Sequence, residues 1–198
     1  AYVMMAFRIA WFKVYQPLAY YAAYFTIRAE GSFNAPVILK GLESQKAELA
    51  RIAALEHSTA VEKGNATVIE VAAEMYLRGM EFLPIDLDRS DASEFKMVDG
   101  KLLPPFNCIP ALGDAVAKEI VRARDEHLFT SKEDLKKRGK VSQSIIDTMD
   151  SMGILKNMPD EEQISLLKSF GASTVQIYRM VKIPSAASAL FSGLQVSA

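Results

Sequence analysis

The central signal of this sequence is the stretch Ile109-Pro110-Ala111-Leu112-Gly113-Asp114-Ala115-Val116-Ala117-Lys118-Glu119-Ile120, in which a tight turn leads directly into a helix. The first backbone N–H groups of a helix have no partner within it, and they lie at the positive end of the helix dipole. Because Gly113 has no Cβ, a phosphate can approach the backbone closely. The stretch therefore predicts an anion-binding turn, and the alternative is a turn that only caps a helix.

The turn and the helix after it resemble the hairpin and second helix of a helix-hairpin-helix motif, in which Pro-Gly-apolar-Gly is followed by Ala four positions on. This sequence differs from the motif in two places. Ala111 replaces the first glycine, and Pro104-Pro105 leaves little room for a complete first helix.

Two further segments look like the second half of a tandem helix-hairpin-helix unit, Phe129-Thr-Ser-Lys-Glu-Asp-Leu135 and Val141-Ser-Gln-Ser-Ile-Ile146. Eight Lys or Arg against six acids lie between Pro110 and Lys140, and four of the eight fall within residues 136–140. The four basic residues within 136–140 could form a local basic edge that binds DNA phosphates, although such a run is also typical of solvated surface. The predicted DNA-binding residues are Ala111, Gly113, Ala115, Lys118, Arg122, Lys136, Lys137 and Lys140.

The composition excludes several classes of protein. Half of the 198 residues are apolar, which predicts a packed core, and 23 Lys or Arg against 24 Asp or Glu leave a net charge of -1. Nucleic-acid binding therefore requires a local patch. The single cysteine, Cys108, excludes an internal disulfide and, with only two histidines, a Cys/His zinc cluster. Without the ~20 apolar residues of a membrane span, we expect a soluble, cytoplasmic protein.

The first half of the chain predicts helices. Apolar spacing favours a helix over residues 1–15, a second over 18–27 after Pro17, and a third from Pro36 to about His57. Thr67 and Glu70 form a capping box for a fourth helix, which Gly79 ends. Nine of the 18 aromatic residues lie between Tyr2 and Phe25, and we expect core rather than a base-stacking surface. The apolar run already present at Ala1 indicates a fragment of a longer protein.

A small β element follows, with residues 82–87 extended and residues 95–98 and 101–103 forming a hairpin on Asp99-Gly100. Three short helices come next, over 114–126, over 132–138 with Ser131 as cap, and over 143–152 between Ser142 and Gly153. Residues 171–198 read as a poorly structured tail. The fold class is therefore mainly α with a small β-hairpin element.

Several stretches in the right order resemble the C-terminal part of the PolC-type DNA polymerase III alpha subunit, the replicase of Gram-positive bacteria. They are Ala1 to Thr26, Phe82-Leu-Pro-Ile-Asp-Leu87, Pro104-Pro-Phe106 with the turn after it, and Ser131-Lys-Glu-Asp-Leu135. The resemblance implies four regions. Residues 1–79 end the fingers domain, 80–158 bind duplex DNA through a tandem helix-hairpin-helix, 159–170 bind the sliding clamp, and 171–198 stay unassigned.

In this family the catalytic carboxylates and their Mg²⁺ ions belong to the palm domain, upstream of the region that this chain resembles. The resemblance therefore implies no catalytic residue, metal ligand or cofactor in this chain, which we expect to be inactive alone. The one close aspartate cluster, Asp86, Asp88 and Asp91, lies in a loop-like stretch without a partner histidine, and we do not expect it to bind a metal.

A pentapeptide near the end of the resemblance is similar to the family's clamp-binding motif, Gln-Leu-Ser/Asp-Leu-Phe. It comprises Gln163, Ile164, Ser165, Leu166 and Leu167, the last in place of Phe. Without the family, an amphipathic turn would be the simpler interpretation.

The function that we predict is the non-specific binding of primer-template duplex DNA and attachment to the sliding clamp during replication. The partners are DNA, the clamp and the upstream polymerase domains, with no membrane, in a nucleoid-associated bacterial location. Alternatives are a stand-alone helix-hairpin-helix interaction module, or a small metal-dependent enzyme that uses the loop from Asp86 to Asp91.

Overall fold

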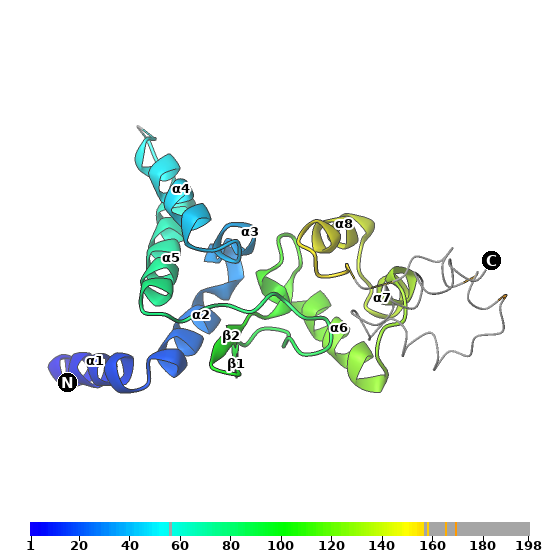
Figure 1. Cartoon of the computed structure of the whole chain (residues 1–198), viewed down its shortest axis with the longest axis horizontal. Coiled ribbons are helices and arrows are strands. Elements are labelled where there is room, and N and C mark those ends of the chain that lie inside the picture. Colours follow the sequence, from blue (N-terminus) through cyan, green and yellow to red (C-terminus); the bar gives the residue numbers. More distant parts are fainter. Residues whose placement is uncertain (56, 157, 159–164, 166–168, 170–198) are drawn as a thin grey trace, which may run out of the picture. The chain divides into compact units, whose positions relative to one another are not determined.

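The structure, a computed structural model, describes residues 1–55, 57–156, 158, 165 and 169 (Figure 1). The described part is mainly helical with a two-stranded antiparallel sheet, which confirms the predicted fold class. Contacts divide the chain into two compact units, Ala1–Lys118 and Glu119–Ala198. None of the helices seen in these residues is both long and apolar enough to cross a membrane.

The described part of the first unit begins with helices α1 (Tyr2–Tyr15), α2 (Pro17–Ser32), α3 (Ala35–Ile38), α4 (Leu42–Ala53) and α5 (Ala60–Leu77). Pro17 begins α2, where its missing N–H costs no helical hydrogen bond. Helix α2 continues beyond the predicted end at Ile27, and Gly31 and Ser32 still belong to it.

The single helix predicted from Pro36 to about His57 is wrong, because the chain breaks between α3 and α4. Gly41 has φ +99°, a conformation that side-chain-bearing residues rarely adopt, and it interrupts the helix. The buried Gln45 donates its side-chain N–H to the carbonyl of Ile38 at 2.9 Å, which ties α4 to the end of α3.

Helix α5 begins earlier than predicted, and its cap is a different residue. Thr59 Oγ1 accepts from the backbone N–H of Glu62 at 3.2 Å, and the Glu62 carboxylate accepts from the N–H of Thr59 at 2.8 Å. This is the capping box, whereas Thr67 lies inside the helix and donates to the carbonyl of Lys63. The predicted end is confirmed, since Gly79 has φ +79°.

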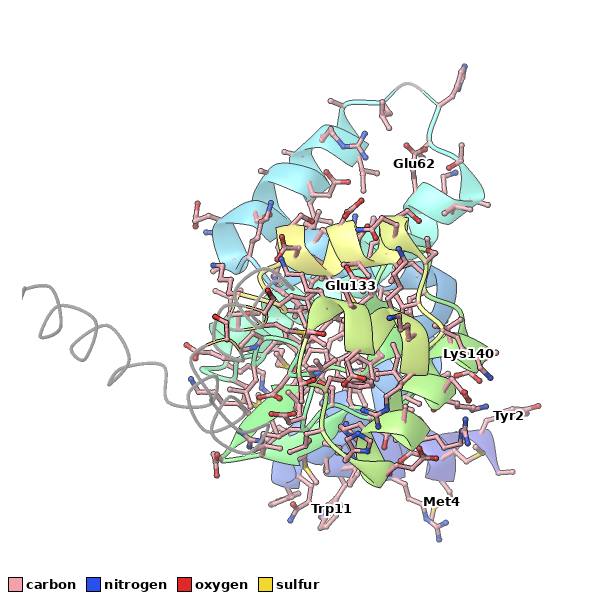
Figure 2. The ribbon with its side chains drawn as sticks, turned by 90° about the vertical axis from the view of Figure 1, so that its right-hand side faces the viewer. Tyr2, Met4, Trp11, Glu62, Glu133 and Lys140 are labelled. Atoms are coloured by element: carbon pink, nitrogen blue, oxygen red, sulfur yellow. The ribbon has the colours of Figure 1, made fainter. Side chains whose placement is uncertain are left out.

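The aromatic-rich segment is core in α2 but not in α1. Tyr21 and Phe25 are fully buried. By contrast, α1 has no buried residue, and Phe7 and Trp11 are 69% and 57% exposed. The expectation of a core stripe is therefore wrong for α1, from which Tyr2, Met4 and Trp11 project outward (Figure 2).

The centre of the first unit is a cluster of four phenylalanines, Phe25, Phe33, Phe82 and Phe95. Every pair of their ring centroids lies between 5.2 and 6.0 Å apart, mostly in edge-to-face or tilted orientations. The rings come from α2, the loop after it, the segment after α5 and the approach to the sheet. The cluster therefore joins segments that are far apart in sequence.

The predicted hairpin is confirmed. Strand β1 (Lys96–Val98) pairs antiparallel with β2 (Lys101–Leu103), and Asp99 and Gly100 have φ of +50° and +75°, as a type I′ turn requires. The predicted extended segment 82–87 pairs with the sheet only at Phe82, in a parallel bridge to Leu102. There Leu83 N–H donates to the carbonyl of Leu102 at 2.7 Å.

The segment after Pro105 forms a short 3-10 helix, η1 (Phe106–Cys108), where a complete motif would have its first helix. Its backbone is fixed to the loop before the sheet, because Phe106 N–H donates to Asp91 O at 2.9 Å and Asn107 N–H to Ala92 O at 3.1 Å. A turn over residues 109–113 then leads into α6 (Asp114–Glu126), with the predicted bounds.

The described part of the second unit contains the end of α6, α7 (Lys132–Arg138) and α8 (Gln143–Ser151). Ser131 caps α7 as predicted, its Oγ accepting from Asp134 N–H at 3.0 Å, whereas Ser142 makes no side-chain cap bond to α8. The Arg138 guanidinium donates to the carbonyls of Ala123 and His127 and pairs with Asp134. Arg138 therefore fastens α7 to the end of α6.

The turn before α6 contains a strained residue that provides a test of the fold. Ala111 has φ +64°, a region that costs a residue with a Cβ ~1 kcal/mol. We expect Ala111→Gly to raise the free energy of unfolding by about 0.5–1 kcal/mol in urea denaturation, because glycine removes this strain. The matched control is Ala115→Gly on the exposed first turn of α6. This change should lower the free energy of unfolding by a similar amount, because glycine is a poorer helix former than alanine. Equal effects of the two changes would contradict strain at Ala111.

Candidate nucleic-acid interface

The turn before α6 is closed by its own backbone. Leu112 N–H donates to Ile109 O at 3.1 Å, and Gly113 O accepts from the N–H groups of Val116 and Ala117, each at 3.0 Å. Leu112 is buried with 4% of its surface exposed, and this side chain anchors the turn. The geometry is that of a hairpin that points the start of α6 outward.

Three consecutive backbone N–H groups at this turn, those of Gly113, Asp114 and Ala115, have no hydrogen-bond partner in the described part of the chain. They belong to the first turn of α6 and its approach, where helical geometry supplies no acceptor. Unpaired N–H groups at the positive end of a helix dipole have the chemistry that an anion such as phosphate requires.

Gly113 is not required by the fold. Its φ is not positive, and a Cβ added to it would meet no atom within 4 Å. A side chain at this position would therefore project into open space beside the N–H groups. The missing Cβ leaves that space open.

The turn between α7 and α8 repeats the first turn. Lys140 has φ +52° and corresponds to Ala111, and Val141, 3% exposed, corresponds to Leu112. Ser142 O accepts from the N–H groups of Ile145 and Ile146 at 3.2 and 3.1 Å, as Gly113 O does in the first turn. The tandem arrangement predicted from residues 129–146 is therefore present in the backbone.

The second turn also presents three N–H groups without a hydrogen-bond partner among the described residues, those of Ser142, Gln143 and Ser144. Sequence reasoning selected side chains in this region and missed these backbone groups. Superposing Lys-Val-Ser-Gln-Ser (140–144) on Ala-Leu-Gly-Asp-Ala (111–115) would have indicated them.

Most of the predicted cations already have partners. Lys118 pairs with Asp114 at 2.5 Å, and Arg122 pairs with Glu119 at 2.6 Å and with Glu126 at 3.5 Å. These side chains are exposed, with 63–66% of their surface accessible, so the pairs are weak and open to exchange. A phosphate would therefore compete with carboxylates for them.

Glu119 binds two of the predicted cations at once. Its Oε1 lies 2.9 Å from Lys140 Nζ as well as 2.6 Å from Arg122. Hydrogen bonds from Arg122 and Lys140 lower the pKa of the Glu119 carboxyl from 4.5 to about 2. The carboxylate is thus ionised at neutral pH. Its contribution to stability is present above pH 4.5 and is lost as the pH falls toward 2.

The two remaining cations lie on the exposed side of α7. Lys136 Nζ donates to Gln143 Oε1 at 2.9 Å, beside the second turn. Lys137 is exposed and makes no hydrogen bond or ion pair with any described residue. The predicted site residues thus fall into a turn in the first unit, with Ala111, Gly113, Ala115 and Lys118, and a group in the second, with Arg122, Lys136, Lys137 and Lys140.

The aspartate cluster shapes loops. Asp86 Oδ1 accepts from the backbone N–H groups of Asp88 and Arg89 at 2.8 and 3.2 Å, and Asp91 Oδ1 accepts from those of Ser93 and Glu94. Lys96 Nζ lies 3.1 Å from the Asp91 carboxylate. Within the described ranges, no group of three His, Cys, Asp or Glu side chains is placed to hold a metal ion. These carboxylates therefore do not fit the Mg²⁺ site of a polymerase.

The predicted clamp-binding pentapeptide falls outside the described residues except for Ser165, which is exposed. The unassigned tail, residues 171–198, also lies outside them.

Comparison with known proteins agrees with this geometry. The helix-hairpin-helix motif family matches residues 79–164, a range that contains both turns. The chain is 49% identical over 166 residues to the DNA polymerase III PolC-type of Thermotoga maritima and 48% identical over 167 residues to that of Bacillus subtilis. Each alignment covers 84% of this chain, which spans 12% of the length of either relative. The chain is therefore similar to a region of PolC-type DNA polymerase III, and its residues 79–164 carry the helix-hairpin-helix motif.

Proposed function

We propose that this chain binds duplex DNA without sequence preference and holds it for a replicative polymerase. The observation that carries the proposal is the pair of turns, each with three consecutive N–H groups that have no partner among the described residues. Backbone N–H groups at a helix start bind phosphate and carry no information about the base. The non-specific binding that a replicase requires follows from this chemistry.

The cations strengthen this interface by exchange of partners. Lys118, Arg122 and Lys140 are exposed cations paired with half-buried carboxylates, and a phosphate takes over part of these contacts when DNA binds. Each such exchange releases ions into solution, so the affinity falls steeply with salt. With a net charge of -1, the chain supplies no general attraction beyond this local edge.

The chemistry of DNA synthesis belongs to the rest of the polymerase in this proposal. The catalytic carboxylates and Mg²⁺ would come from the palm domain, since the aspartate cluster of this chain is used by its own loops. The exposed apolar side chains of α1 would pack against upstream domains. Such a face, with Phe7 and Trp11 more than half exposed, is typical of a contact surface.

Residues Gln163, Ile164, Ser165, Leu166 and Leu167 would attach the polymerase to the sliding clamp. The glutamine offers an amide for a polar pocket, and the leucines offer apolar side chains for a neighbouring one. Leucine in place of the motif's final phenylalanine fills an aromatic-sized pocket less completely. The contact would be weaker than that of the full motif.

The phosphate site at the first turn can be tested with Gly113→Val. The valine side chain would project into the space beside the N–H groups of the turn, and we expect duplex affinity at low salt to fall about tenfold. Gly113→Ala should give a smaller loss. Fluorescence anisotropy with a labelled duplex measures both, and urea denaturation checks that the fold persists. Unchanged affinity of a folded Gly113→Val variant would exclude this turn as a phosphate site.

The exchange of ion partners can be tested at Glu119. We expect Glu119→Gln to bind duplex DNA severalfold more tightly at low salt, because Arg122 and Lys140 lose their shared carboxylate. Glu133→Gln makes the same charge change on α7, where Glu133 has no ion pair with a described residue, and it measures the general effect of one charge (Figure 2). Equal gains in the two variants would show that Arg122 and Lys140 do not contact DNA.

The clamp contact can be tested with a peptide of residues 160–170. We expect micromolar-class binding to a bacterial sliding clamp, about -8 kcal/mol, since a short segment loses conformational freedom when it binds. Replacing Gln163 and Leu166 by Ala should abolish binding measured by calorimetry, and Leu167→Phe should tighten it. A double-Ala peptide that binds as well as the parent would show that the pentapeptide is a chance match.

A further inference from the structure

A cavity of about 450 Å³ lies beside the first turn, entirely within the first unit. One wall is the stretch from Asn107 to Gly113, and the others come from the end of α2, the loop after it and Asn65 on α5. Helices α2 and α5 approach each other closely beside the cavity. A Cβ added to Gly64 on α5 would lie 3.7 Å from Ser32 Oγ on α2. The cavity therefore brings the helical half of the unit next to the phosphate site.

The lining of this cavity is uncharged and combines polar with apolar groups. Three carboxamides, those of Asn34, Asn65 and Asn107, and the hydroxyl of Ser32 face it, and no Lys, Arg, Asp or Glu belongs to its lining. A carboxamide carries two N–H donors and an acceptor oxygen. Such a lining can bind an anion by hydrogen bonds, and no carboxylate is present to repel it.

These side chains are not used by the fold. Asn107 Oδ1 is completely buried and has no hydrogen-bond partner. The carboxamides of Asn34 and Asn65 make no hydrogen bond within the described part of the chain, although Asn34 occupies the cap position of α3. A buried polar atom without a partner lowers stability, and Asn107 Oδ1 is such an atom. Asn34 and Asn65 are half-buried, and their carboxamides are open to a ligand.

We propose that this cavity is a second, uncharged phosphate subsite, which binds the phosphodiester next to the one held by the turn. The inference rests on the proposed DNA binding and extends it. Asn34 and Asn65 donate side-chain N–H groups to the phosphate oxygens. When the phosphate binds, Asn107 Oδ1 accepts from the second N–H of one of these carboxamides and so gains the partner that it lacks in the free chain. The end of α2 and α5 thus contact DNA directly, where the sequence had assigned them only to the end of the fingers domain.

The absence of charge gives this subsite a distinctive signature in salt. Loss of a Lys or Arg contact lowers the slope of log affinity against log salt concentration, because fewer counterions are released. Loss of a neutral donor lowers the affinity and leaves the slope unchanged. The two kinds of contact are therefore separable in one titration series.

The test uses the full chain and a labelled duplex at several salt concentrations. Asn34→Ala with Asn65→Ala should weaken binding about tenfold with an unchanged slope, since hydrogen bonds to charged groups are the stronger ones. Asn65→Asp should weaken it further, because a carboxylate would face the phosphate. Gln16→Glu is the matched control, an amide-to-acid change at an exposed position outside the cavity. Circular dichroism confirms that each variant is folded.

The outcomes separate this inference from the proposed function. Loss of affinity in Gly113→Val without any loss in the double-Ala variant would overturn the subsite alone. No loss in either variant would overturn the proposed DNA site as well. If Asn65→Asp and Gln16→Glu lowered the duplex affinity equally, the added negative charge alone would explain the loss, and the subsite would be overturned. If inorganic phosphate at constant ionic strength shifted the side-chain amide NMR signals of Asn34 and Asn65 as strongly as the duplex does, the cavity would be a free-anion site, and the assignment to a DNA strand would fall.

Discussion

The packing of four phenylalanine rings is the constraint on which the first unit depends. Phe25, Phe33, Phe82 and Phe95 are all at least nine-tenths buried, and burial of each side chain contributes ~1.5–3 kcal/mol. Because the cluster positions the loop around Asp91 and Ala92, and η1 is hydrogen-bonded to that loop, it also determines where the turn at residues 109–113 lies. The N–H groups that we propose as the phosphate site are thus held by a hydrophobic contact between segments distant in sequence. The short helices around them could not hold this position alone.

The interface combines two kinds of electrostatics that respond differently to their surroundings. The N–H groups at Gly113 and at Ser142 are fixed dipoles, oriented by the backbone before any ligand arrives. Lys118, Arg122 and Lys140 are already paired with carboxylates, and hydrogen bonds from Arg122 and Lys140 lower the pKa of Glu119. In the proposed interface, the fixed dipoles would place the phosphate, and the exchange of ion pairs would make the affinity depend on salt. A chain with almost no net charge can therefore still bind a polyanion locally.

Local sequence patterns correctly predicted the features that neighbouring residues determine, such as turns, helix caps and helix ends. The type I′ turn at Asp99-Gly100, the cap at Ser131 and the bounds of α6 follow from a few neighbouring residues, and the structure confirms them. The predictions that were wrong depend on residues outside the short stretch of sequence that each pattern covers. Thr59 and Thr67 both precede a Glu by three residues, and the pattern does not reveal which pair begins the helix. The aromatic stripe of α1 has a helical period, but periodicity does not show what covers it. The N–H groups of the second turn were missed because the site residues were chosen by their side chains. The cavity at Asn34, Asn65 and Asn107 was missed because carboxamides far apart in sequence carry no motif.

Both turns use a residue with a side chain at a left-handed position that a glycine would occupy without strain. Ala111 and Lys140 have φ of +64° and +52°, and each is followed by a buried apolar residue, Leu112 or Val141. Burial of that residue contributes more than the ~1 kcal/mol of backbone strain, so packing imposes the turn conformation. A turn imposed by packing has fewer alternative conformations than a glycine turn, and it loses less entropy when a phosphate binds. The N–H groups are consequently preorganised. Weak neutral contacts at such a site can contribute to affinity, since little of their free energy is used to order the chain.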